Sequence, residues 1–80
     1  MNKKFHWSKE YCSYSYLRVK GRFLVSLSRC DEYKWTEGII LNLSSDSPYT
    51  PIFEKTCYGD THYADAKKIL EKQAENLHIL

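Results

Sequence analysis

Apolar and polar side chains alternate from Tyr14 to Leu27, on both sides of Lys20-Gly21. Alternation with a period of two is typical of β-strands. A glycine at the second position of a two-residue loop provides the positive φ angle that tight hairpin turns need. The pattern therefore predicts a β-hairpin in which Leu17 lies opposite Leu24.

This register separates the hairpin into two unlike faces, because successive side chains point to opposite sides of a sheet. The face with the larger side chains holds Tyr14, Tyr16, Phe23, Val25 and Leu27. A third strand is predicted from Trp35 to Leu43, and pairing Cys30 with Lys34 brings its large side chains to the same face. Those side chains are Trp35, Ile39, Leu41 and Leu43. We expect this face to form the core.

The second half of the chain predicts a loop, a short strand and a helix. Residues 44–51 contain two prolines, three serines and an aspartate, a composition typical of a loop. A fourth strand is expected over residues 52–58. From Thr61 onward the apolar spacing becomes three or four, which indicates an amphipathic helix. Its apolar face holds Tyr63, Ala66, Leu70, Ala74 and Leu77, with Ile69 and Gln73 at the edge.

Together these segments predict an α+β fold. We expect an antiparallel sheet of three to four strands, arranged as a β-meander, with one C-terminal helix packed on one face. The chain has 80 residues, of which 15% are aromatic and 28% are charged. This length suits a single domain, residues 1–80, and this composition is typical of a folded chain rather than a disordered one.

Charge and cysteine content narrow the class of protein. The net charge of +2 is too small to indicate a nucleic-acid-binding protein by itself. No apolar run approaches the ~18 residues of a membrane span, and residues 1–12 lack the apolar run of a signal peptide. The three cysteines, Cys12, Cys30 and Cys57, are widely spaced, which favours free thiols in a reducing compartment. We therefore expect a cytoplasmic protein with no membrane contact.

Cys57 and His62 are candidates for a metal site or for a nucleophile with its base, because they lie five positions apart. Structural zinc sites usually contain closely spaced ligand pairs such as Cys-x2-Cys, which this sequence lacks. A single thin core also leaves little room for a cleft that excludes water. We therefore expect no metal, no cofactor and no enzymatic activity.

The other face of the predicted sheet carries apolar side chains that one helix would not cover. They are Leu17, Val19, Leu24 and Ile40, with serines around them. An apolar patch with a small polar rim is typical of a protein–protein interface. Three occupants of this patch remain open: a partner protein, a second copy in a homodimer, or the chain's own N-terminal segment with Phe5 and Trp7.

Three cations, Arg18, Lys20 and Arg22, cluster at the tip of the predicted first hairpin. They would steer the protein toward an acidic or nucleic-acid-like surface. Direct binding of RNA or DNA through this basic hairpin is the alternative function, since cations and aromatic side chains on a sheet can hold single strands.

The end of the sequence, YGDTHYADAKKILEKQAENL, follows the last predicted strand. This order of strands and helix resembles small phage and prophage proteins, some of which are anti-CRISPR proteins that act by occupying a nuclease or surveillance-complex surface. The resemblance covers mainly residues 52–77 and identifies no site residue. It implies a non-enzymatic inhibitor whose partner is a host protein or a ribonucleoprotein complex.

Overall fold

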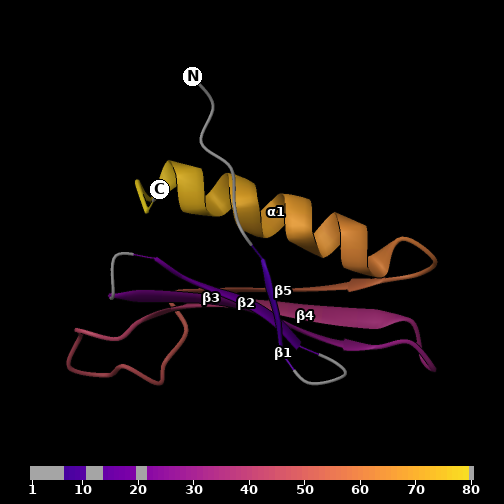
Figure 1. Cartoon of the computed structure of the whole chain (residues 1–80), viewed down its shortest axis with the longest axis horizontal. Coiled ribbons are helices and arrows are strands. Elements are labelled where there is room, and N and C mark those ends of the chain that lie inside the picture. The colour runs from indigo at the N-terminus through magenta and orange to yellow at the C-terminus, as the bar shows by residue number, and fades with distance from the viewer. Residues whose placement is uncertain (1–6, 11–13, 20–21, 80) are drawn as a thin grey trace.

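The computed structural model describes the backbone of residues 7–10, 14–19 and 22–79, and the side chains of Trp7 and residues 22–79. In the described part of the chain, five antiparallel strands form one sheet in chain order, and the C-terminal helix packs across one face of it (Figure 1). The elements are β1 (Ser8–Glu10), β2 (Tyr14–Val19), β3 (Phe23–Cys30), β4 (Trp35–Asn42), β5 (Phe53–Tyr58) and α1 (His62–Asn76). The predicted α+β meander is confirmed, with the short β1 added at one edge.

The first hairpin is paired one residue away from the predicted register. Val19 pairs with Phe23, so three residues lie between β2 and β3 instead of the predicted two. The backbone of Leu17 consequently pairs with Val25 and not with Leu24. Because the side-chain period of a strand is two, a shift of one residue exchanges the faces of β2 relative to β3.

The second hairpin is shifted in the same way, because its turn has four residues instead of three. Cys30 pairs with Trp35, and Lys34 closes the turn with a φ of 55°. The carbonyl of Lys34 also accepts the backbone N–H of Gly59 at 3.0 Å, which ties this turn to the end of β5. As a result Val25 pairs with Ile40, and the predicted pairing with Ile39 is wrong.

The core lies between α1 and the helix-facing side of the sheet. Val25 and Leu27 on β3 are fully buried, as the sequence predicted, and so is Ile40 on β4. Among the described residues, the buried apolar cluster consists of Val25, Leu27, Ile40, Ala66, Leu70, Ala74 and Ile79. The predicted core positions Trp35, Ile39, Leu41 and Leu43 alternate with Ile40 or continue that alternation, so they belong to the opposite side of the sheet.

A glycine on β4 allows the helix to pack closely against the sheet. A Cβ atom on Gly38 would lie 2.3 Å from Leu70 Cδ2 and 3.1 Å from Leu27 Cδ2. Those distances leave no room for a side chain, and the space is filled by the fully buried leucine of the helix. Gly38 therefore identifies the side of β4 that faces α1.

The helix ends in a left-handed turn that returns the chain to the core. The N–H of His78 bonds to the carbonyl of Glu75, and the N–H of Ile79 bonds to the carbonyl of Ala74. With His78 at a φ of 56°, this is a Schellman motif. It buries Ile79 completely, whereas Leu77, which the periodicity placed on the apolar face, is 38% exposed.

Candidate interaction surface

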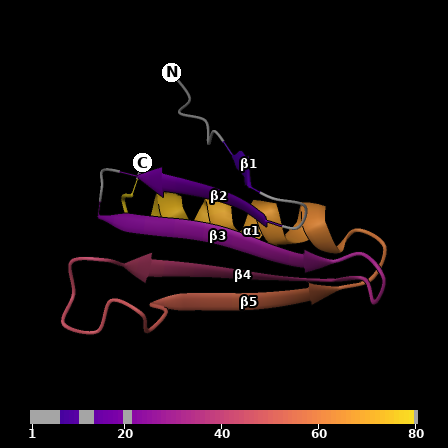
Figure 2. The same cartoon turned by 60° about the horizontal axis from the view of Figure 1, so that its bottom comes forward.

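The sheet has one covered face and one open face. Figure 2 shows the sheet in front of the helix, with the strands side by side across the face that the helix does not touch. Phe53 and Cys57 pack against the core cluster, so the alternate residues of β5 lie on the open face, as do those of β4 that alternate with Ile40. We define the open-face patch as Trp35, Glu37, Ile39, Glu54, Thr56 and Tyr58.

Two aromatic side chains lie at one end of the open-face patch. Trp35 on β4 pairs directly with Tyr58 on β5. Trp35 is half-buried, whereas Tyr58 is 73% exposed. Tyr33, in the turn that precedes β4, is 70% exposed. Side chains of this kind combine large contact area with a polar tip, which is why they are enriched at protein interfaces.

Carboxylates lie beside the aromatic pair. Glu37 and Glu54 are both exposed, and they occupy diagonal positions because Glu37 pairs with Thr56. Among the described side chains, the open faces of β3, β4 and β5 carry these two carboxylates and no lysine or arginine. The patch is therefore locally acidic, although the whole chain has a net charge of +2.

The structure places the predicted apolar anchors on different sides of the sheet. Ile40 has no exposed surface and packs in the core, so its predicted role in partner binding is wrong. Leu24 remains on the open face, where it is half-buried and pairs with Leu41. Leu41 is only 9% exposed, and the loop between β4 and β5 bends below the sheet at this end (Figure 1). The open-face patch therefore lies at the more accessible end of the open face.

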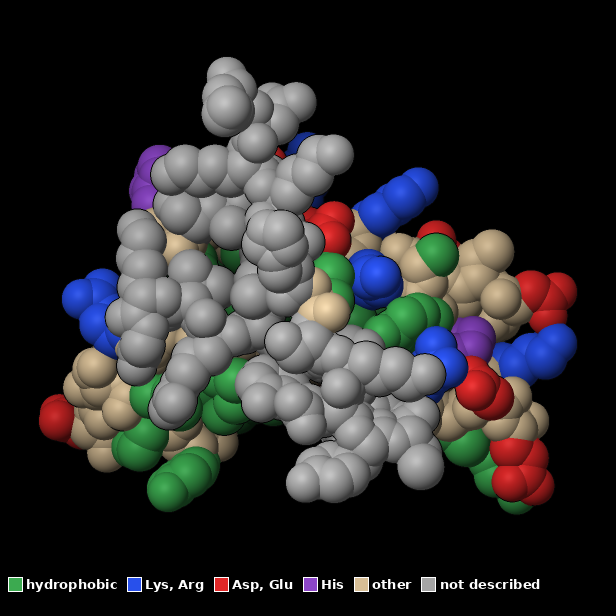
Figure 3. Space-filling model, viewed as in Figure 1, with side chains coloured by type: hydrophobic (Ala, Val, Ile, Leu, Met, Phe, Trp, Pro, Cys, Tyr) green, Lys and Arg blue, Asp and Glu red, His purple; other side chains and the backbone are tan. Residues whose placement is uncertain are grey.

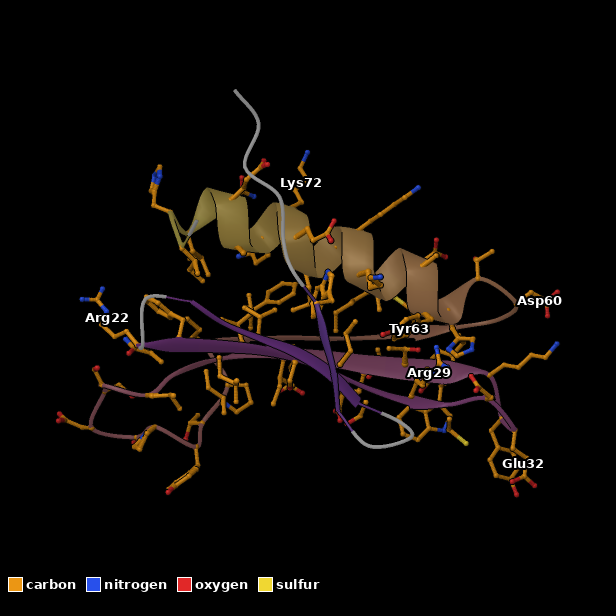
Figure 4. All side chains as sticks on the ribbon, in the orientation of Figure 1. Arg22, Arg29, Glu32, Asp60, Tyr63 and Lys72 are labelled. Carbon is orange, nitrogen blue, oxygen red and sulfur yellow. The ribbon has the colours of Figure 1, made fainter. Side chains whose placement is uncertain are left out.

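The predicted basic tip is described only in part. The structure gives the backbone of Leu17, Arg18 and Val19 but not their side chains, and Lys20 lies outside the described residues. Arg22 is exposed and stacks on Phe23, with its guanidinium carbon 5.1 Å from the ring centroid. Figure 4 shows Arg22 at the end of the molecule opposite the β3–β4 turn, so it does not border the open-face patch.

Trp7, the N-terminal residue whose side chain is described, lies on the helix side of the sheet. Trp7 packs against the core, and its indole Nε1 donates to Glu71 Oε2 on α1 at 2.7 Å. The Lys67 ammonium nitrogen lies 6.0 Å from the centroid of the Trp7 ring. The alternative in which Trp7 covers the open face is therefore wrong, while Phe5 lies outside the described residues.

A polar cluster on the helix side contains a hydroxyl, an imidazole and a carboxylate. Thr36 Oγ1 is 2.5 Å from His62 Nδ1, and His62 Nε2 is 3.7 Å from Asp31 Oδ1. This order of groups is found in hydrolytic triads. Here, however, Thr36 has no exposed surface, so its hydroxyl cannot reach a substrate. The pair instead links the first turn of α1 to β4 and satisfies two buried polar groups.

Charged side chains of opposite sign extend this cluster toward the surface. Arg29 Nε lies 3.5 Å from Asp31 Oδ1, and the guanidinium carbon lies 4.4 Å from the centroid of the Tyr63 ring. Lys34 Nζ is 2.6 Å from Asp60 Oδ1. Figure 3 shows basic, acidic and histidine side chains gathered at this end of the molecule, and Figure 4 shows Arg29 beside Tyr63. Arg29 and Lys34 therefore already have carboxylate partners.

Cys57 and His62, the candidate thiol–imidazole pair, make separate contacts. Cys57 is half-buried and packs against the core, while His62 is engaged with Thr36. Within the part of the chain that the structure describes, no group of three His, Cys, Asp or Glu side chains is arranged to hold a metal ion. In the same part of the chain, α1 does not have the length and apolar character needed to cross a membrane.

Sequence reasoning missed the open-face patch because it assigned Trp35 and Ile39 to the core.

Comparisons with protein-family models, with curated proteins and with solved structures found no match to this chain.

Proposed function

We propose that this chain is a small binding protein that docks on a partner protein through the open-face patch. The observation that carries the proposal is the exposed Tyr58 beside Trp35, on the sheet face that α1 does not cover. Tyr and Trp are frequent anchors of protein interfaces because each contributes a large rigid area with few rotatable bonds.

The sheet surface beside Trp35 and Tyr58 allows a partner to come into close contact. β3 presents Ser26, Ser28 and Cys30 next to β4, and these small side chains pair with Ile39, Glu37 and Trp35, respectively. The larger side chains of β4 therefore rise beside a low polar strip. A partner surface can approach both, which supports contact over the strip as well as at the aromatic pair.

As a narrower proposal, the protein acts as a stoichiometric inhibitor of the phage type, and its target is a host protein or ribonucleoprotein complex such as a defence nuclease. The support is the strand order and final helix that resemble such proteins, together with an aromatic docking face. Binding to a second copy of the chain is the competing mode of covering the same face.

The test compares two tyrosines that are exposed to similar extents. Tyr58→Ala removes an anchor from the open-face patch, whereas Tyr49→Ala removes the 87% exposed tyrosine of the β4–β5 loop. Each tagged variant is expressed in the native cell, and the partner that co-purifies with the wild-type chain is identified and quantified. We expect loss of the partner with Tyr58→Ala, retention with Tyr49→Ala, and unchanged thermal unfolding for both.

Nucleic acid is the rival partner, because exposed aromatic side chains on a sheet can also stack on bases. The carboxylates of Glu37 and Glu54 oppose it, since they would lie near the phosphates. A salt titration of binding to a random oligonucleotide decides between the two. Binding that weakens steeply as salt rises, and that Tyr58→Ala removes, would favour the rival.

A further inference from the structure

We infer that the partner places a cationic segment, bearing arginine or lysine, against the open-face patch. This inference rests on the proposed function, because it specifies the chemistry of the partner that docks there. It replaces the expectation that the chain's own cations steer it toward an acidic surface.

Among the described residues, no cation is paired with the carboxylates of the open-face patch. Ion pairs among the described residues join Arg29 to Asp31 and Lys34 to Asp60, and His62 lies near Asp31. None of these pairs involves Glu37 or Glu54. Two like charges at diagonal positions of neighbouring strands repel each other, so a cation between them would be attracted by both.

The helix side of the sheet contains the combination of contacts that the described side chains of the open-face patch leave incomplete. On the helix side, an aromatic ring, a carboxylate and a cation form a complete set: Arg29 stacks on Tyr63 at 4.4 Å and contacts Asp31 at 3.5 Å. The open-face patch has the ring of Tyr58 and the carboxylates, but its described side chains supply no cation. A partner's arginine would complete the second set.

The order of the residue pairs on β4 and β5 places an aromatic pair next to a carboxylate. The pairs Trp35–Tyr58, Glu37–Thr56 and Ile39–Glu54 follow one another along β4 and β5. An aromatic pair at one end of these two strands is therefore followed by Glu37 and then by Glu54. A guanidinium can stack on an aromatic ring while donating two hydrogen bonds to a carboxylate, whereas an ammonium can satisfy the two contacts only as a point charge. This arrangement favours arginine over lysine.

The test uses fluorescein-labelled octa-arginine, octa-lysine and octa-glutamate peptides with the full chain. Binding is measured by fluorescence anisotropy at two salt concentrations. Glu37→Gln/Glu54→Gln removes both charges from the patch with little change of shape. The matched control, Asp46→Asn/Glu75→Gln, removes two exposed charges from the β4–β5 loop and the helix, so the net charge of the two variants is equal.

We expect octa-arginine to bind the wild-type chain more tightly than octa-lysine, and octa-glutamate not to bind. The patch variant should weaken octa-arginine binding about tenfold, because two partly solvated ion pairs of ordinary strength are lost. The control variant should stay within about twofold of the wild-type affinity, since it changes only the long-range field. Tyr58→Ala should also weaken octa-arginine binding.

Equal weakening by the patch and control variants would overturn the inference, as would failure of octa-arginine to bind the wild-type chain. Repeating the native co-purification with the patch variant separates this failure from that of the proposed function. If Tyr58→Ala loses the partner and Glu37→Gln/Glu54→Gln keeps it, the docking face stands and the cationic partner is wrong. If both variants keep the partner, the docking face itself is wrong.

Discussion

Ile39 and Ile40 are adjacent and chemically identical, yet they belong to opposite sides of the sheet. Ile40 packs in the core beside Val25 with no exposed surface, whereas Ile39 lies half-buried beside Glu54 in the open-face patch. The difference arises from strand alternation alone. The role of each side chain in this protein is therefore set by register, and register is set by the length of the turns.

The two sides also use their polar groups differently. On the covered side, the buried Thr36 and His62 satisfy each other, and Arg29 lies between Asp31 and Tyr63. On the open side, the exposed carboxylates of Glu37 and Glu54 have no ion-pair partner among the described side chains. The polar groups named on the covered side therefore contact one another, whereas the two carboxylates of the open side are exposed to solvent.

The largest effect that tests this comparison is expected from alanine substitution of Ile39 and Ile40. Ile40→Ala should lower the free energy of unfolding by about 2–5 kcal/mol, because it removes apolar contacts and leaves a cavity under the helix. Ile39→Ala should cost about 1 kcal/mol or less, since part of its surface is already in water. Chemical denaturation of the two variants measures both values. The reverse order of costs would restore the predicted register and remove the open-face patch.

The hydrophobic pattern could predict the elements but not this register. The existence and order of β3, β4, β5 and α1 and the burial of Val25 and Leu27 follow from periodicity and turn composition. The run Ile39-Ile40-Leu41, however, offers an apolar side chain to both faces, so apolar content does not choose between registers. The choice depends on turns one residue longer than predicted, one of them closed by a lysine with positive φ.

The same ambiguity of register explains why the sequence did not predict the candidate site. Trp35 has the size and shape of a core residue, and only the four-residue turn before it moves it to the open face. One signal in the sequence does indicate the correct register. Gly38 and Thr36 are small enough to face a closely packed helix, which identifies their side as the one that α1 covers.

Gly38→Ala should produce the next largest effect. The added methyl group would lie 2.3 Å from Leu70 Cδ2, so either the leucine or the helix must move. We expect a loss of about 3 kcal/mol, at the upper end of the usual cost of overpacking. Chemical denaturation of Gly38→Ala, Leu70→Ala and the double variant would measure the coupling between the two sites.

The coupling decides whether the steric explanation is correct. If the clash is the cause, the double variant should be more stable than the sum of the two single losses predicts, because the smaller side chain on α1 gives space to the new methyl group. Strictly additive losses would mean that Gly38 is needed for its backbone and not for its lack of a side chain.

Thr36→Val tests the polar link between the sheet and the helix. The substitution keeps the shape of the side chain and removes the hydroxyl that pairs with His62 Nδ1. It should cost about 1–2 kcal/mol, because a buried imidazole nitrogen loses its partner. Thr56→Val, on the open side of β5, is the matched control and should change stability little. Equal thermal shifts for the two variants would contradict the proposed role of the hydroxyl.

The smallest effect is expected at the turn that completes the covered side. His78 has a φ of 56°, a conformation that glycine adopts without strain, and it allows Ile79 to reach the core. His78→Gly should therefore raise the free energy of unfolding by up to about 1 kcal/mol. Glycine removes the strain of the left-handed conformation in the folded state, and its greater entropy in the unfolded state offsets part of that gain. His78→Ala is the control, since it removes the imidazole but keeps the Cβ atom. If both substitutions stabilised the protein equally, the gain would come from loss of the imidazole, and the turn would hold Ile79 in the core without backbone strain.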